Sequence, residues 1–225
     1  MADSIAGVVA ALIAFAFCLS TFERFLDRAK PHELAWSIAL LMFAIASSAL
    51  AVGASVGWTS ASFRTFYLFG GVTNVPFLAT GTIYLLFGRR WGNTTFLLVS
   101  LYSMFAAGIV LSTRFHEPLP RHVLAQAAKV LPGLPEILAG VASGLGSIVL
   151  IGGAIYSALR IRRGRLVLAN CLIAVGTLVT GASGLMNSVF DKMTAFSVSL
   201  SIGISIIFVG FLVAADGTTT QNHPA

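Results

Sequence analysis

Residues 69–81 read FGGVTNVPFLATG and lie near the middle of a long apolar run that extends from about Phe63 to Phe87. A proline is unusual there, because it cannot donate a backbone hydrogen bond to the preceding turn of a helix. An asparagine is also unusual, because its amide is costly to bury unless it is hydrogen-bonded. How this stretch is interpreted depends on the solvent in which the run folds.

Composition identifies that solvent as lipid. The 225-residue chain is 57% hydrophobic and only 10% charged, and its mean hydropathy is +0.91. Soluble domains carry roughly 25% charged residues. A helix needs about 20 apolar residues to cross a bilayer, and seven runs are long enough to be candidates. These runs are Ile5–Phe22, Leu34–Gly57, Phe63–Phe87, Thr95–Leu111, Ile137–Leu159, Leu166–Phe190 and Met193–Ala215.

The runs are continuously apolar and do not alternate, which favours helices over the strands of a membrane barrel. We therefore predict an all-α fold, a polytopic membrane protein whose residues 1–225 form one domain of seven transmembrane helices. The first run is expected to be a retained helix, since Met1–Ser4 holds an aspartate and no Lys or Arg, unlike a signal peptide. Cys18 and Cys171 have no CxxC partner, so neither a disulfide framework nor a zinc site is predicted.

The basic residues indicate an orientation and not a nucleic-acid partner, although the net charge is +6. More of them follow the first, third and fifth runs than lie on the opposite side. The positive-inside rule then places the N-terminus outside a cell (plasma) membrane and the C-terminus in the cytoplasm. The predicted cytoplasmic group is Arg24, Arg28, Lys30, Arg89, Arg90, Arg160, Arg162, Arg163 and Arg165, and the outer group is Arg64, Arg114, Arg121, Lys129 and Lys192.

Short matched segments suggest an internal repeat. AGVVAAL at 6–12 matches AGVASGL at 139–145, and GASVG at 53–57 matches GASG at 181–184, with weaker matches in the same order. We predict half-repeats 5–88 and 137–217 on either side of a linker helix at about 95–111. Four helices separate equivalent starts, so the halves would be parallel, which is one of the symmetries found in transporters.

This three-plus-one-plus-three pattern resembles the architecture of SWEET and PQ-loop transporters and, more distantly, that of the opsins. The resemblance implies a transporter built from two parallel halves. It does not extend to opsin chemistry, since the retinal lysine of that family lies mid-membrane in the last helix, whereas Lys192 lies at the start of the corresponding run.

No Asp, Glu, Lys, Arg or His falls in the central part of any of the seven runs. Such residues mark proton and ion paths in membranes, so their absence argues against a pump. It argues equally against an intramembrane enzyme, which needs a general base or metal ligands. The pairs His32–Glu33 and His116–Glu117 fall at the edges, on opposite sides of the membrane. We predict no catalytic site, cofactor or metal.

The polar residues within the runs are neutral. Pro76 leaves backbone carbonyls that a neighbouring helix, Thr73, Asn74 or water could bond. A kinked helix with an amide at mid-depth suits a site for a neutral solute. The alternative is packing, because small residues and hydroxyls let membrane helices approach closely. The predicted substrate-binding residues are Thr73, Asn74, Pro76, Asn170, Asn187 and Ser201.

These features lead us to expect a transporter or facilitator of a small neutral or amphipathic solute in a lipid bilayer. The alternative is a non-catalytic accessory or sensory subunit of a larger membrane assembly, joined to a membrane-protein partner or to copies of itself. A polar cavity between the third, sixth and seventh helices would favour transport, whereas a dry and closed bundle would favour the accessory role.

Overall fold

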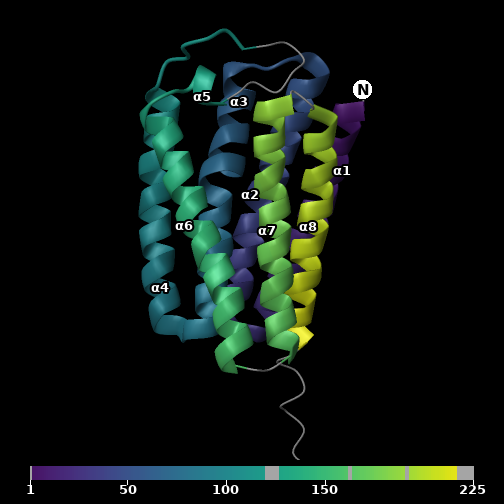
Figure 1. Cartoon of the computed structure of the whole chain (residues 1–225), viewed down its shortest axis with the longest axis vertical. Helices are drawn as coiled ribbons and strands as arrows, with labels where there is room; N and C mark the ends of the chain where they lie inside the picture. Colours follow the sequence, from purple (N-terminus) through teal and green to yellow (C-terminus); the bar gives the residue numbers. More distant parts are fainter. Residues whose placement is uncertain (1, 120–126, 162–163, 191–192, 217–225) are drawn as a thin grey trace, which may run out of the picture.

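The computed structural model describes residues 2–119, 127–161, 164–190 and 193–216 (Figure 1). Within these ranges, side chains are described for residues 4–119, 129–157, 159–160, 164–181 and 198–213. Every regular element in this part of the chain is helical, and several helices are long and apolar. The predicted all-α fold class is therefore confirmed.

The long helices run side by side along the long axis of a bundle (Figure 1). Two short π-helical segments, η1 and η2, continue α3 and α6, and α5 is a single turn in the connection before α6. The elements are α1 Ala2–Arg28, α2 Pro31–Val56, α3 Ser60–Phe66, η1 Tyr67–Thr73, α4 Asn74–Ser112, α5 Ala127–Val130, α6 Leu134–Tyr156, η2 Ser157–Ile161, α7 Gly164–Phe190 and α8 Met193–Asp216.

Length and hydropathy identify five helical stretches in the described residues that could each cross a membrane. They are Ser4–Arg28, Pro31–Val56, Ser60–Ser112, Leu134–Tyr156 and Gly164–Gly181. A shorter apolar helix, Val198–Val213, lies within α8. These helices fit a membrane protein.

The 53-residue stretch Ser60–Ser112 is not one straight helix. Gly88 has φ 82° and ψ −175°, a conformation that glycine adopts readily, and the chain turns back there at the lower end of Figure 1. The turn is tight, because a Cβ on Gly92 would lie 2.0 Å from the Tyr84 ring. Tyr84 closes it by donating from its hydroxyl to Asn93 Oδ1 at 2.8 Å. The linker helix predicted at about 95–111 lies in the part of α4 that follows this turn.

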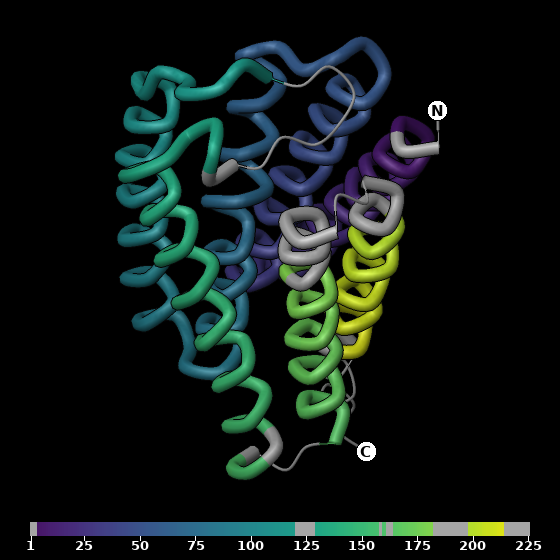
Figure 2. Tube along the Cα trace, turned by 45° about the horizontal axis from the view of Figure 1, so that its top comes forward, coloured from purple at the N-terminus to yellow at the C-terminus, as the bar shows by residue number. Residues whose placement is uncertain are grey.

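Contacts between neighbours arrange the long helices in a ring. α1 packs against α2 and α8, α2 against α4, α4 against α6, and α6 against α7. The ring closes where α7 packs along α8, which Figure 2 shows as the green and yellow helices side by side. Glycine allows this last approach, since a Cβ on Gly203 would lie 2.4 Å from Thr180 Cγ2 and 3.0 Å from the Gly176 carbonyl oxygen.

The upper end of the bundle in Figure 1 is held by hydrogen bonds to backbone carbonyls. The Arg64 guanidinium, near the start of the α3–η1–α4 helix, donates to the carbonyl oxygens of Val110, Leu111 (2.9 Å) and Thr113 (2.7 Å). Carbonyls in the last turn of a helix have no partner within it. Arg64 therefore caps the end of α4, and its guanidinium carbon lies 4.5 Å from the centre of the Phe115 ring.

The helix pairs differ between the two halves of the proposed repeat. In the first half, the most extensive contact joins the first and second helices, α1 and α2. In the second half, it joins the second and third, α7 and α8. The parallel half-repeat 5–88 and 137–217 therefore stays a prediction.

Candidate functional site

The stretch around Pro76 joins a π-helix to an α-helix. The π-helical segment η1 ends at Thr73, and α-helical geometry resumes at Asn74, so Pro76 lies in the first turn of α4. The helical backbone is continuous from η1 into α4, so the missing N–H of Pro76 leaves a carbonyl of the preceding turn without its backbone donor. The sequence predicts a kink at Pro76, and the structure has its irregular backbone in the π segment directly before this residue.

Two hydroxyl groups bond carbonyls near the proline. Ser143 Oγ, from α6, donates to the Gly71 carbonyl oxygen at 2.9 Å, and Thr73 Oγ1 donates to that of Leu68 at 3.0 Å. Pro76 offers no N–H to the carbonyls one turn earlier, so the Ser143 bond supplies a donor where the backbone has none. A neighbouring helix and Thr73 are two of the donors that the sequence suggested.

Asn74 links the same region to α2. Its side chain is 5% exposed, and Nδ2 donates to the Ala39 carbonyl oxygen at 2.8 Å. Gly146 of α6 packs against the Val75–Pro76 backbone so closely that a Cβ there would lie 2.8 Å from Val75 Cγ1. These contacts are those of a packed joint between three helices. We call it the Pro76 junction and define it by Gly71, Thr73, Asn74, Pro76, Ser143 and Gly146.

A second group of buried polar side chains lies at the lower end of the bundle in Figure 1, where α2 begins. His32 is 7% exposed, and Glu33 and Trp36 are each 1% exposed. The sequence predicts that His32 and Glu33 lie at the membrane edge, before an apolar run that begins at Leu34. The helix starts earlier, at Pro31, so both residues lie in its first turn and pack into the bundle.

Trp36 is the point where three helices meet in this region. Its ring stacks on Phe211 of α8 at 4.4 Å between centroids, and His32 packs against it edge-on at 5.1 Å. On α4, Gly81 lies directly beside the indole, since a Cβ there would be 2.1 Å from Trp36 Nε1. The indole nitrogen therefore points into the bundle, towards α4.

At the same level of the bundle, α6 packs closely against α4. Thr82 follows Gly81 in α4, and its Cγ2 would lie 2.8 Å from a Cβ on Gly153. Ser157 lies one helical turn beyond Gly153, in η2, and is fully buried. This places the Ser157 side chain near the level of Trp36.

At this level, α7 also packs closely against α8. Gly210 precedes Phe211 in α8, and a Cβ on it would lie 3.0 Å from the Ala169 carbonyl oxygen. Asn170 is the next residue and is 1% exposed. Its Nδ2 donates to the Leu166 carbonyl oxygen at 3.0 Å. We define the basal polar layer as His32, Glu33, Trp36, Ser157 and Asn170.

The basal polar layer contains buried polar atoms that have no hydrogen-bond partner within the described part of the chain. They are His32 Nε2, both Glu33 carboxylate oxygens, Trp36 Nε1, Ser157 Oγ and Asn170 Oδ1. A buried polar group without a partner costs about 1–3 kcal/mol, and more if it is charged. Native proteins contain few such groups, and their gathering in one layer points to a site where something else binds.

Charged groups surround the layer on the side of α1. Arg24, Asp27 and Arg28 in the last turns of α1, together with Lys30, act electrostatically on Glu33. Partial burial lowers the pKa of the Lys30 ammonium, against the opposing attraction of Glu33. The surroundings of Glu33 are therefore more positive than negative.

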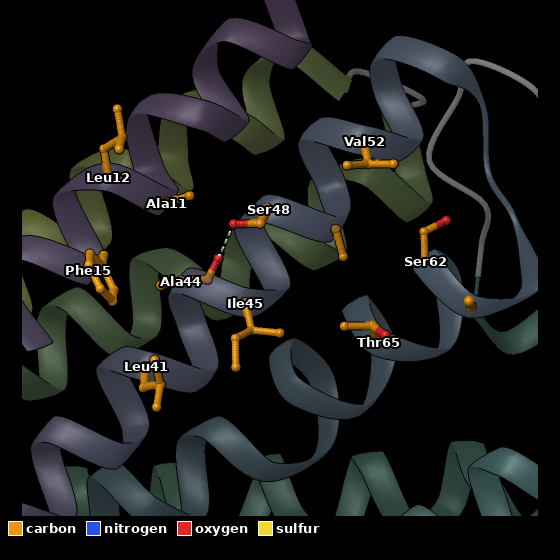
Figure 3. Close-up of a pocket in the computed structure, with 12 residues that line it drawn as sticks. Ala11, Leu12, Phe15, Leu41, Ala44, Ile45, Ser48, Val52, Ser62 and Thr65 are labelled. Carbon is orange, nitrogen blue, oxygen red and sulfur yellow. Dashed lines mark hydrogen bonds between the residues drawn. The ribbon is translucent and has the colours of Figure 1, made fainter.

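An apolar groove of about 540 Å³ lies between α1, α2 and α3 (Figure 3). Ser48 Oγ, on its wall, donates its proton to the Ala44 carbonyl oxygen at 2.8 Å. Such a surface suits a hydrocarbon chain better than a polar solute. The groove is lined by Ala11, Leu12, Phe15, Leu41, Ala44, Ile45, Ser48, Ala49, Val52, Ala61, Ser62 and Thr65.

The structure separates the predicted substrate-binding residues. Thr73, Asn74 and Pro76 lie in the Pro76 junction, whereas Asn170 lies in the basal polar layer. Ser201 is half-buried in α8, and the Asn187 side chain lies outside the described residues.

Four members of the basal layer, His32, Glu33, Trp36 and Ser157, are not among the site residues predicted from the sequence, and only the three on α2 had a signal in the sequence. Pro31 was the available signal, because proline favours the first position of a helix and so marks a start before His32. Among the side chains that the structure describes, no group of three His, Cys, Asp or Glu residues is arranged to hold a metal ion.

No protein family, curated protein or solved structure matches this chain.

Proposed function

We propose that this chain is a transporter or facilitator that binds a small neutral or amphipathic solute in the basal polar layer. One observation carries the proposal: donors and acceptors without partners lie buried beside the stacked rings of Trp36 and Phe211. Apolar walls with a few converging polar groups are typical of small-molecule sites. The polar end of such a solute would hydrogen-bond to the polar groups that lack partners, and its apolar body would pack against the aromatic rings.

The proposal includes seven membrane crossings. Gly88 divides Ser60–Ser112 into two helices, each longer than the roughly 20 residues that a crossing requires. α8 supplies the last crossing after α7. Seven crossings agree with the parallel half-repeat inferred from the ordered sequence matches, which we keep as part of the proposal.

Charge supports the orientation of the bundle. Arg24, Arg28 and Lys30 lie at its basal end with Arg89 and Arg90, which follow the turn at Gly88. Under the positive-inside rule this end faces the cytoplasm. The solute would therefore enter or leave the basal polar layer from the cytoplasmic side.

The Pro76 junction supplies a way for the layer to open. The π segment η1 and Pro76 interrupt the helix that carries Gly81, and Gly81 lies against Trp36. π segments and prolines are the usual places where helices bend, and π segments are frequent at functional sites. Bending at the junction would move Gly81 relative to the indole and admit a solute.

The accessory or sensory role is the second candidate, and the Pro76 junction favours it. The Asn74, Thr73 and Ser143 side chains each donate to a backbone carbonyl, and the Asn74 and Ser143 bonds join helices to one another. A protein of this class would use its outer surface, including the apolar groove, to contact a partner helix.

Osmotic swelling of liposomes separates the two roles. Full-length protein would be reconstituted, and swelling in glycerol, urea or 1,2-hexanediol would be followed by stopped-flow light scattering. We expect swelling faster than in empty liposomes for at least one solute, and slower swelling with Trp36→Phe, which keeps an aromatic side chain but removes the indole N–H. The matched control is Trp91→Phe at an exposed position. Folded wild-type protein that accelerates none of the three would contradict transport of these solutes and favour the accessory role.

A further inference from the structure

Glu33 is the most unusual member of the basal polar layer. It is 1% exposed, and both of its carboxylate oxygens lack a hydrogen-bond partner among the described residues. An ionised carboxylate is far more costly to bury without a partner than a neutral carboxylic acid. Buried ionisable groups in membrane proteins commonly belong to proton relays and ion paths.

We infer that Glu33 is a proton-binding site: its carboxyl group carries a proton in this packed form of the bundle and releases it when the basal layer opens to water. The reaction is simple protonation of a carboxylate, and it needs no other reactant. The proton would be taken up from the outer side of the membrane and released to the cytoplasm when the basal layer opens, so that one proton crosses with each solute; this coupling rests on the proposed transport function.

The charged neighbours explain why the proton can leave. Arg24, Arg28 and Lys30 favour the ionised carboxylate, whereas Asp27 opposes it. These groups belong to α1 and to the connection after it, and His32 lies on the same turn as Glu33. In the packed form, the Glu33 side chain is 1% exposed and its oxygens have no hydrogen-bond partner among the described residues. Once water enters, the burial penalty falls and the excess of positive charge stabilises the carboxylate.

Other helices carry titratable side chains near residues of this region, namely Tyr84 near Gly81, Tyr156 and Arg160 near Ser157, and Cys171 next to Asn170, but the charged groups that act on Glu33 are Arg24, Asp27, Arg28 and Lys30. On α4, the residue against Trp36 is Gly81, and on α8 it is Phe211. The α8 side chains after Val213 lie outside the described residues. Glu33 is thus the acidic group that the described part of the layer offers.

A proton fits this site better than a metal ion. Trp36 Nε1 packs tightly against Gly81, and a proton needs no cavity and no set of ligands. The positive charges of Arg24, Arg28 and Lys30 disfavour a metal cation beside Glu33. In the described part of the chain, no three His, Cys, Asp or Glu side chains are arranged to hold a metal ion.

Infrared spectroscopy tests the protonation directly. In liposomes at neutral pH, the full-length protein should show the C=O stretch of a protonated carboxylic acid, shifted by exchange into heavy water. The band should disappear in Glu33→Gln and persist in Glu23→Gln, the same change at an exposed position. If Glu33→Gln does not fold, Glu33→Asp keeps a carboxyl group and should shift the band. Absence of the band in the wild type, or its persistence unchanged in the Glu33 variants, would overturn the inference.

Solute accumulation under a pH gradient tests the coupling separately. One proton moved per solute corresponds to about a tenfold change in the accumulation ratio per pH unit, and this dependence should be lost in Glu33→Gln. A Glu33 band without uptake of any tested solute would support the proton site and count against the proposed transport. Uptake indifferent to the gradient would overturn the coupling, and uptake with no Glu33 band would overturn the proton site.

Discussion

The Pro76 junction and the basal polar layer are both buried polar regions of one bundle, and they differ in how their polar groups are satisfied. In the junction, Asn74, Thr73 and Ser143 each donate to a backbone carbonyl. In the basal layer, Glu33 and Trp36 present polar atoms without partners in the described structure. A satisfied polar group holds helices together, whereas an unsatisfied one favours a partner from outside the chain. The comparison assigns packing to the first region and binding to the second.

The largest effect is expected where each region depends on a glycine. A Cβ on Gly81 would lie 2.1 Å from Trp36 Nε1, and one on Gly146 would lie 3.2 Å from the Val75 carbonyl carbon. Overpacking a core typically costs about 1–3 kcal/mol, occasionally more. We expect Gly81→Val to exceed this range, because a rigid indole cannot move aside, and Gly146→Val to fall within it.

Thermal unfolding in detergent, with gel filtration as a check on folding, would measure both glycine variants. Gly140→Val is the matched control, since nothing lies within 4 Å of a Cβ there. A Gly81→Val protein as stable as Gly140→Val would contradict the packing of Trp36 against α4.

The next effect concerns Asn74. Replacing it with leucine removes the bond to the Ala39 carbonyl, and interhelical hydrogen bonds in membranes contribute about 0.6 kcal/mol on average. Asn74→Leu should therefore lower stability by about that amount while solute uptake is retained. Uptake abolished in a variant of near-normal stability would transfer the binding role to the junction.

The smallest effect is a coupling between Ser143 and Pro76. Ser143→Ala removes the donor to the Gly71 carbonyl, at a cost of about 0.6 kcal/mol by the same average. Pro76→Ala restores a backbone N–H that can bond the preceding turn. Ser143→Ala should therefore cost less in the Pro76→Ala background. A double-mutant cycle of unfolding free energies measures the difference, and additive costs would mean that Ser143 does not compensate for the proline.

The fold class was predictable from the sequence because it follows from composition and from the length of the apolar runs. The inward orientation of Asn74 was predictable as well, since an unpaired amide in hydrocarbon is costly. The π segment before Pro76 was not, because FGGVT has no pattern that distinguishes π from α geometry.

The basal polar layer could not be predicted from the sequence, for a different reason. Its members Trp36, Ser157 and Asn170 come from three separate helices, and no local pattern shows that these helices meet. The apolar run after Leu34 also concealed the true start of α2 at Pro31. Burial of Glu33 follows from tertiary packing and not from its neighbours in the chain.

Two identical substitutions in the α6–η2 helix test the central claim most directly, with osmotic swelling and thermal unfolding measured on the same preparations. Ser143→Ala removes a hydroxyl that is bonded in the junction, and Ser157→Ala removes one that has no partner in the described basal layer. We predict that Ser143→Ala lowers stability and keeps uptake. Ser157→Ala should keep or raise stability and slow uptake by up to about tenfold, the value of one ordinary hydrogen bond to a solute. Lower stability with normal uptake in Ser157→Ala would contradict the assignment of binding to the basal polar layer.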